Sequence, residues 1–115
     1  MNELNEEILN DVFFALSDPT RRGILKRVAK NTLSVNEIAE PYEISLAAVS
    51  KHIQVLERAE LISKEKQGRS YRCRMNFSSL EDASKLIQEY KQFWTKRLDS
   101  LEKYLDNQQQ SKEQQ

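Results

Sequence analysis

The stretch that decides the fold is Ser45-Leu46-Ala47-Ala48-Val49-Ser50-Lys51-His52-Ile53-Gln54-Val55-Leu56. Its first serine is a good helix cap, because the hydroxyl can accept a hydrogen bond from a free amide of the first turn. The helix is expected to reach about Ala59. At about 100° per residue, one side is aliphatic and carries Val49, Ile53 and Leu56, followed by Glu60. The opposite side is small and polar and should stay exposed, with Ala47, Lys51, Gln54 and Arg58 on it and Ala48, Ser50 and His52 on its flanks.

Three patterns predict helices before this stretch. Ser34 and Glu37 have the spacing of a capping box, which predicts a short helix over residues 35–41. Asp18 followed by Pro19 predicts the start of another helix, because Asp caps free amides and Pro is tolerated at the first helical position. The first helix, ending near Ser17, is indicated by apolar residues that recur every four positions: Leu4, Ile8, Val12 and Leu16.

A basic hairpin is predicted after the stretch. Residues 61–66 and 71–76 resemble strands on either side of Gln67-Gly68-Arg69-Ser70, where the glycine can take the positive φ of a tight turn. In the second strand Arg72 and Arg74 alternate with Tyr71, Cys73 and Met75, so guanidinium groups line one face. This hairpin has the form of a β-wing.

The last element is predicted to be a long helix. Ser78 and Glu81 are spaced as a second capping box, and the helix should run to about Asp106, roughly 42 Å. Its apolar residues form a nearly continuous seam that needs a partner: Leu80, Ala83, Ile87, Tyr90, Trp94, Leu98, Leu101 and Leu105. The Gln-rich residues 107–115 are interpreted as a disordered polar tail, which leaves residues 1–106 as one domain.

Composition and charge limit the class of protein. Of the 115 residues, 31% are charged and 38% apolar, with two Gly and two Pro, which favours a helix-rich soluble domain. No apolar run approaches the ~20 residues that cross a bilayer, and the acidic start lacks the layout of a signal peptide, so a cytoplasmic protein is expected. The net charge is zero, but residues 20–74 hold twelve bases against six acids. This basic middle indicates a polyanionic partner.

The predicted order of elements is a winged helix-turn-helix plan, mainly α with a two-stranded wing, in which the helix from Ser45 enters the major groove of double-stranded DNA. Ser45 is expected among the DNA contacts, small Ala47 and Ala48 would allow close approach, and Ser50 and Gln54 could bond bases. Lys51 could reach phosphate or guanine, and Arg69 and Arg72 could bind phosphate or a narrow minor groove. His52 fits a structural hydrogen bond or a phosphate contact equally well.

These residues resemble the ArsR-type family of repressors over about residues 12–76. The shared motifs are Ala15-Leu16-Ser17-Asp18-Pro19-Thr20-Arg21-Arg22, Val35-Asn36-Glu37-Ile38-Ala39, the run from Ser45 to Leu56, and Leu61-Ile62 before Gly68-Arg69-Ser70-Tyr71. The resemblance implies a homodimer that binds an inverted repeat and represses the promoter it overlaps. The first and last helices would build the dimer, through Leu4, Ile8, Val12, Ile87, Tyr90, Trp94, Leu98 and Leu101.

Metal and enzyme chemistry find no support in the sequence. Family members that sense metals do so through cysteines at the start of the third helix or through Asp and His in the last helix. Residues 32–39 contain no Cys and the last helix no His, so the resemblance is to a metal-independent branch, without cofactor. Cys73 is expected to pack in the core, although redox sensing is an alternative, and catalytic constellations are missing.

Two further possibilities concern partners. An inducer or a partner protein, neither of them identified by the sequence, could release the DNA. The alternative to a repressor is a protein-interaction winged helix, whose surface should favour Tyr, Trp or Met anchors. The small and polar residues at Ala47, Ser50 and Gln54 favour DNA instead.

Overall fold

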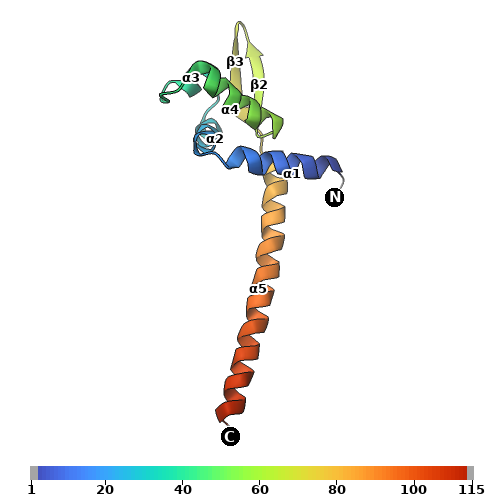
Figure 1. The fold of residues 1–115 in the computed structure, drawn as a ribbon. Helices are drawn as coiled ribbons and strands as arrows, with labels where there is room; N and C mark the ends of the chain where they lie inside the picture. Colours follow the sequence, from blue (N-terminus) through green and yellow to red (C-terminus); the bar gives the residue numbers. More distant parts are fainter. Residues whose placement is uncertain (1–2, 114–115) are drawn as a thin grey trace. The chain divides into compact units, whose positions relative to one another are not determined.

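The computed structural model describes residues 3–113, and the side chains of residues 6–111. The elements in chain order are α1 (Glu3–Leu16), α2 (Pro19–Lys30), β1 (Leu33–Ser34), α3 (Val35–Ala39), α4 (Leu46–Arg58), β2 (Ile62–Gln67), β3 (Ser70–Met75) and α5 (Ser78–Glu113) (Figure 1). The chain divides into two compact units, Met1–Ala83 and Ser84–Gln115. The first unit contains the helix-turn-helix and the wing, and the second contains most of α5.

Three of the predicted helix caps are confirmed. The Asp18 carboxylate accepts a hydrogen bond of 3.0 Å from the amide of Arg21, with Pro19 at the first helical position of α2. Both bonds of the capping box between Ser34 and Glu37 are present, at 3.1 and 3.2 Å. The hydroxyl of Ser45 accepts from the amide of Ala48 at 3.1 Å and opens α4. Each cap satisfies an amide that has no partner inside its helix.

The long helix α5 begins at Ser78 as predicted, but its predicted capping box and its predicted end at Asp106 were wrong. No capping box joins Ser78 to Glu81, because the amide and hydroxyl of Ser78 both bond to the side-chain oxygen of Asn76, at 3.2 and 3.1 Å. At the other end the helix continues past Asp106 to Glu113, through part of the predicted disordered tail. A polar composition indicates that a segment lacks a core, but Gln, Lys and Glu are good helix formers and no Gly or Pro ends the helix.

The wing is confirmed and is part of a larger sheet. Strands β2 and β3 pair antiparallel from Ile62 opposite Met75 to Gln67 opposite Ser70. Gly68, the first of the two loop residues, has φ 62°, a conformation that suits glycine at this position of a hairpin turn. The short strand β1, which the sequence did not predict, pairs with the other side of β3 and gives the order β1-β3-β2.

The core lies inside the first unit, between the helices and one face of the sheet. The inner face of α4 is buried as predicted, with Val49, Ile53 and Leu56 all 0% exposed. Glu60 does not continue this face, because α4 ends at Arg58 and Glu60 follows it with φ 58°. The amides of Glu60 and Leu61 bond back to the carbonyls of Glu57 and Leu56, which turns the chain sharply into β2.

Candidate nucleic-acid interface

The outer face of α4 is free of cover from the first unit. Ala47, Lys51, Gln54 and Arg58 are exposed, while Ala48, Ser50 and Val55 are half-buried. The described residues place no acid within ion-pair distance of Lys51 or Arg58. The capping hydroxyl of Ser45 is already bonded to the helix backbone. A row of small and polar side chains with uncovered cations can approach a groove whose edges are lined by phosphates.

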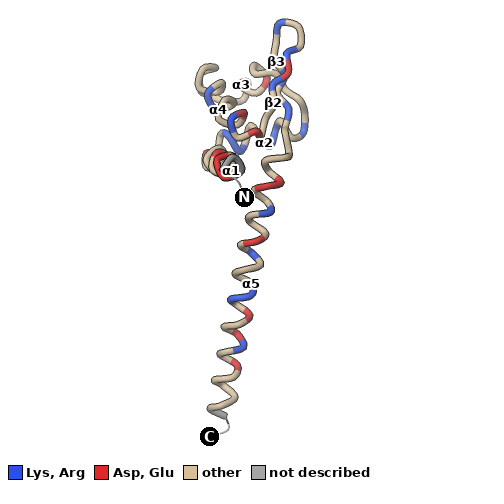
Figure 2. Tube along the Cα trace, turned by 90° about the vertical axis from the view of Figure 1, so that its right-hand side faces the viewer, with Lys and Arg blue, Asp and Glu red and all other residues tan. Residues whose placement is uncertain are grey.

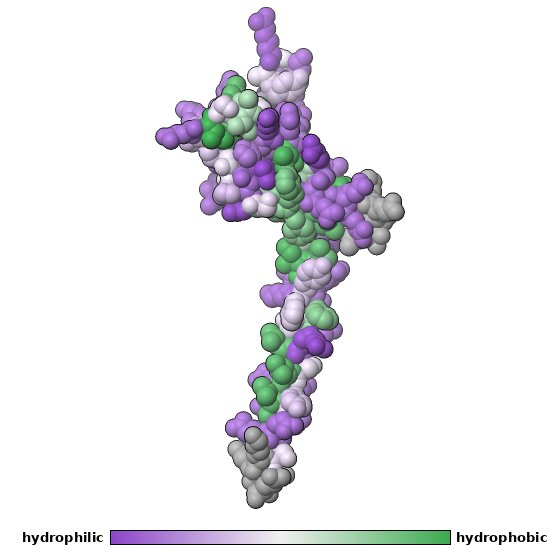
Figure 3. Space-filling view, in the orientation of Figure 1, coloured by the Kyte–Doolittle hydropathy of each residue, from purple (hydrophilic) through white to green (hydrophobic). Residues whose placement is uncertain are grey.

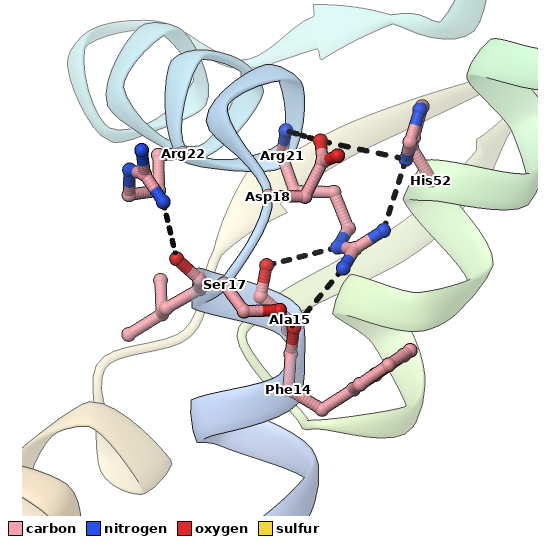
Figure 4. Close-up of polar contacts among 8 residues, drawn as sticks. Phe14, Ala15, Ser17, Asp18, Arg21, Arg22 and His52 are labelled. Atoms are coloured by element: carbon pink, nitrogen blue, oxygen red, sulfur yellow. Dashed lines mark hydrogen bonds and ion pairs between the residues drawn. The ribbon is translucent and has the colours of Figure 1, made fainter.

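A buried arginine holds α4 in place from behind. The side chain of Arg21 in α2 is only 8% exposed, and it donates to the carbonyls of Ala15 at 2.9 Å and Phe14 at 3.0 Å at the end of α1. Its Nη1 lies 3.2 Å from Nδ1 of His52 on α4 (Figure 4). The guanidinium also lies over the Phe14 ring, 5.0 Å from its centre. One side chain therefore connects α1, α2 and α4.

The contact with Arg21 assigns the two expected roles of His52, a structural hydrogen bond and a phosphate contact, to different ring nitrogens. Because arginine can only donate, this hydrogen bond requires Nδ1 to accept, which is the tautomer with the ring hydrogen on Nε2. Figure 4 shows the second ring nitrogen on the side away from Arg21. The carboxylate of Asp18 lies 4.0 Å from Nδ1 of His52. The pKa of Asp18 is held below its ordinary value, first by the hydrogen bond from the amide of Arg21 and also by the charges of the Arg21 and His52 side chains. His52 is fixed through Nδ1 and keeps a donor at Nε2.

Figure 2 shows Lys and Arg residues along the hairpin and at its tip. These cations fall into two groups, those with an acidic neighbour and those without one in the described part of the chain. Lys64 pairs with Glu57 at 3.2 Å, and Arg74 pairs with Glu65 at 3.2 Å. Among the described residues, no acid lies within ion-pair distance of Lys66 or Arg69. The tip is therefore the part of the wing whose positive charge is not neutralised by a neighbour.

Arg72 belongs to the group with an acidic neighbour. Its guanidinium, predicted to be free to bind DNA, is instead bonded within the protein. Its Nη2 donates to the carbonyl of Thr32 at 2.7 Å, and its Nη1 lies 3.4 Å from Glu37. The cause is the unpredicted strand β1, which brings Thr32 and the start of α3 beside β3. The pKa of Glu37 is lowered, first by the amide of Ser34 and also by Arg72. Arg72 therefore anchors the sheet to α3.

The second unit presents a broad apolar face. At about 100° per residue the large apolar side chains of residues 86–105 fall in a sector about 140° wide. Figure 3 shows hydrophobic surface along this helix. Eight of these side chains are between 52% and 63% exposed: Ile87, Tyr90, Phe93, Trp94, Leu98, Leu101, Tyr104 and Leu105. The predicted seam from Ile87 onward is part of this face, whereas its first residues, Leu80 and Ala83, belong to the first unit, where Ala83 is buried. Phe93 and Tyr104 were missed because they lie outside a strict heptad pattern. An apolar stripe of this width is typical of a helix that packs on more than one neighbour.

The residues predicted for a dimer contact in α1 are placed differently. Val12 is 0% exposed and lies in the core of the first unit with Leu9, because this face of α1 contacts α2 and α4. Val12 is thus removed from any dimer surface. Ile8 is half-buried, and the side chain of Leu4 lies outside the described residues.

Two exposed residues that the sequence analysis missed lie beside the predicted contacts. Lys66 is one residue from the wing loop and has no acidic neighbour in the described part of the chain. Leu46, the first residue of α4, is 51% exposed. Alternation along β2 could have indicated Lys66, whereas Leu46 was passed over because apolar residues are usually assigned to a core.

Neither a metal cluster nor a membrane span is found in the part of the chain that the structure describes. No three His, Cys, Asp or Glu side chains there are grouped to hold a metal ion. None of the helices searched combines the length and the apolar character needed to span a bilayer. Cys73 is fully buried, and burial raises the pKa of its thiol.

Comparison with known proteins decides the family. Residues 16–65 match a family described as a helix-turn-helix domain. The transcriptional repressor SdpR of Bacillus subtilis is 37% identical over 75 residues, covering 65% of this chain and 83% of the repressor. The crystal structure of an ArsR family transcriptional regulator is 34% identical, with a TM-score of 0.74, and the match covers 78% of this chain and 93% of that one. The chain belongs to the ArsR family.

The ArsR assignment agrees with the architecture. A homodimeric winged helix-turn-helix DNA-binding domain from Mycobacterium bovis, solved in solution, has a TM-score of 0.57 and 22% identity, over 85% of this chain and 91% of that domain. At that identity the likeness concerns the fold alone. The chain is an ArsR-type transcriptional regulator, with α3 and α4 as its helix-turn-helix and β2 and β3 as its wing.

Proposed function

We propose that this ArsR-type regulator acts in the cytoplasm as a homodimeric repressor of a promoter whose inverted-repeat operator it covers. Each α4 lies in a major groove, with Ala47, Ala48, Ser50 and Gln54 toward the bases. Lys51 and the Nε2 hydrogen of His52 contact phosphates, and the wing tip follows the adjacent backbone through Arg69. The observation that carries the proposal is the outer face of α4, which is exposed while its inner face is fully buried.

The dimer is supported by the apolar face of α5. Eight large apolar side chains more than half exposed on one helix form a surface that a soluble monomer rarely leaves uncovered. Binding to an inverted repeat requires the two copies of α4 in a twofold dimer to enter major grooves about 34 Å apart, one turn of DNA. Repression is favoured by the identity to SdpR, a named repressor.

The experiment is a gel-shift series with the DNA immediately upstream of the gene. The wild-type chain should shift a discrete site, and its affinity should fall steeply with salt, with a slope of about −0.9 for each phosphate contact. Lys51→Ala and Arg69→Ala should each weaken binding by roughly 5- to 10-fold. Lys96→Ala, the same loss of charge on the polar side of α5, is the matched control and should bind as wild type.

An alternative function is protein interaction, in which the exposed hairpin and α5 serve another protein and DNA is incidental. That alternative predicts no specific shift at low salt with any upstream fragment. It also predicts that Lys51→Ala and Lys96→Ala have the same affinity for DNA. Either result would contradict the repressor proposal.

A further inference from the structure

The first turn of α4 carries apolar side chains where a DNA-reading helix needs its closest contacts. Leu46 is 51% exposed, Ala47 is exposed and Ala48 is half-buried, so none of the first three residues has a side-chain donor or acceptor. The one hydroxyl nearby, that of Ser45, accepts a hydrogen bond from the amide of Ala48 at 3.1 Å, which holds its oxygen at the helix cap. Ile44, just before the cap, is 43% exposed. Figure 3 shows hydrophobic surface over this junction of α3 and α4.

The polar residues of the same face begin one turn later. Ser50 lies four residues after Leu46, and Lys51 lies four residues after Ala47, so each apolar residue shares a row with a polar one. The face therefore changes from apolar at the helix start to polar in the second turn.

The chemistry of the major groove offers one apolar group, the C5 methyl of thymine. The residues at the start of a recognition helix are the ones that reach base edges. We propose that Leu46, with Ala47 beside it, determines specificity by packing against the methyl of thymine in each half-site. This inference rests on the proposed operator binding, and it names the base that the first turn of α4 selects.

The size of the effect follows from burial of a single methyl group. Moving one methyl group out of water is worth about a fourfold change in affinity. A symmetric operator carries the contact twice, so loss of both methyls should weaken binding by about 15-fold. Polar contacts by Ser50, Lys51 and Gln54 should be unaffected, because thymine and uracil present the same hydrogen-bonding groups.

The test uses the full chain and the operator duplex found by footprinting the upstream DNA. Each thymine is replaced in turn by deoxyuridine at symmetric positions, and affinity is measured by fluorescence anisotropy. At one or two thymine pairs per operator, the wild-type chain should lose about 15-fold in affinity. Leu46→Ala should bind the thymine duplex about as weakly as wild type binds the uracil duplex, and should lose little more on uracil substitution.

The control variant is Ile44→Ala, which removes a similar exposed aliphatic side chain outside the helix. It should keep the full response to deoxyuridine, and circular dichroism should show that both variants fold. Equal binding to thymine and uracil duplexes would overturn the assignment while leaving the repressor proposal intact. The assignment would also be overturned if Leu46→Ala lost as much affinity as wild type when deoxyuridine replaces thymine. Failure to bind any upstream duplex would overturn the repressor proposal and this inference with it.

Discussion

The two amphipathic helices α4 and α5 differ in where their apolar faces go. The inner face of α4 is covered by its own unit, with Val49, Ile53 and Leu56 at 0% exposure. The corresponding residues of α5, such as Trp94 at 63% and Leu98 at 62%, are mostly exposed. A helix whose apolar side is buried within its own unit can use its other side to bind a ligand. A helix whose apolar side is uncovered needs a partner for that side first.

The largest expected effect comes from placing a charge on the apolar face of α5. Trp94→Glu should weaken dimerisation by at least about 4 kcal/mol, roughly 1,000-fold, because a twofold contact buries two carboxylates without partners and loses two large aromatic anchors. Sedimentation equilibrium would measure the change. Thr95→Glu introduces the same charge one residue away, outside the apolar sector, and should remain dimeric. If both variants dimerise equally, this face is not the dimer contact.

The next effect concerns the way α4 is held by its own unit. Arg21→Ala should lower the free energy of unfolding by about 2 kcal/mol, since it leaves the carbonyl of Ala15 without its side-chain donor and removes one of the bonds to the carbonyl of Phe14, which keeps its donors from Ser17. Urea unfolding would show the loss as a lower midpoint. Arg22→Ala removes one exposed bond to the carbonyl of Leu16 and should cost less than about 1 kcal/mol. Comparable losses in the two variants would refute a central role for Arg21.

A smaller effect separates the two kinds of cation in the wing. Arg72→Ala should lower the free energy of unfolding by about 1 kcal/mol, through its bonds to Thr32 and Glu37, and should leave the salt dependence of DNA binding unchanged. Arg69→Ala should do the opposite, reducing the salt slope by about 0.9 without loss of stability. Parallel urea and anisotropy titrations would distinguish them. A lower salt slope for Arg72→Ala than for Arg69→Ala would contradict the assignment of Arg72 to structure and of Arg69 to DNA contact.

The smallest expected effect is a gain in stability at the end of α4. Glu60 has φ 58°, and this left-handed conformation costs a residue with a Cβ about 1 kcal/mol. Glu60→Gly should raise the free energy of unfolding by about 0.5 kcal/mol, because the flexibility of glycine in the unfolded chain offsets part of the relief. Glu60→Ala keeps the Cβ and should bring no gain. A gain in both variants would mean that the charge of Glu60, and not its backbone, is responsible.

The sequence was sufficient at most places where the deciding interaction is local, although at the start of α5 the bonds from Ser78 to nearby Asn76 stand in place of the predicted capping box. Periodicity identified the buried side of α4, and the caps at Asp18, Ser34 and Ser45 form as predicted because each side chain bonds an amide three residues away. It failed where the partner is distant. Strand β1 has two residues and exists only through pairing with β3, so neither it nor the bond from Arg72 to Thr32 could be read locally.

The candidate site shows the same division. The exposure of Lys51 and Gln54 followed from the helical period, since their positions oppose a strongly aliphatic face. The attachment of His52 to Arg21 joins residues 31 apart, and only the packing of α2 on α4 brings them together. Val12 was assigned to the wrong surface, because an apolar stripe does not say whether its own chain or another one covers it.

The burial of Cys73 has a practical consequence for measuring the assembly. It is the chain's one cysteine, it is 0% exposed, and burial raises the pKa of its thiol, so it should alkylate slowly in the folded protein. A second cysteine introduced at the exposed Gln67 beside the wing loop would then be labelled selectively. Spin labels attached there in both protomers would report the separation of the two wings, with and without a duplex.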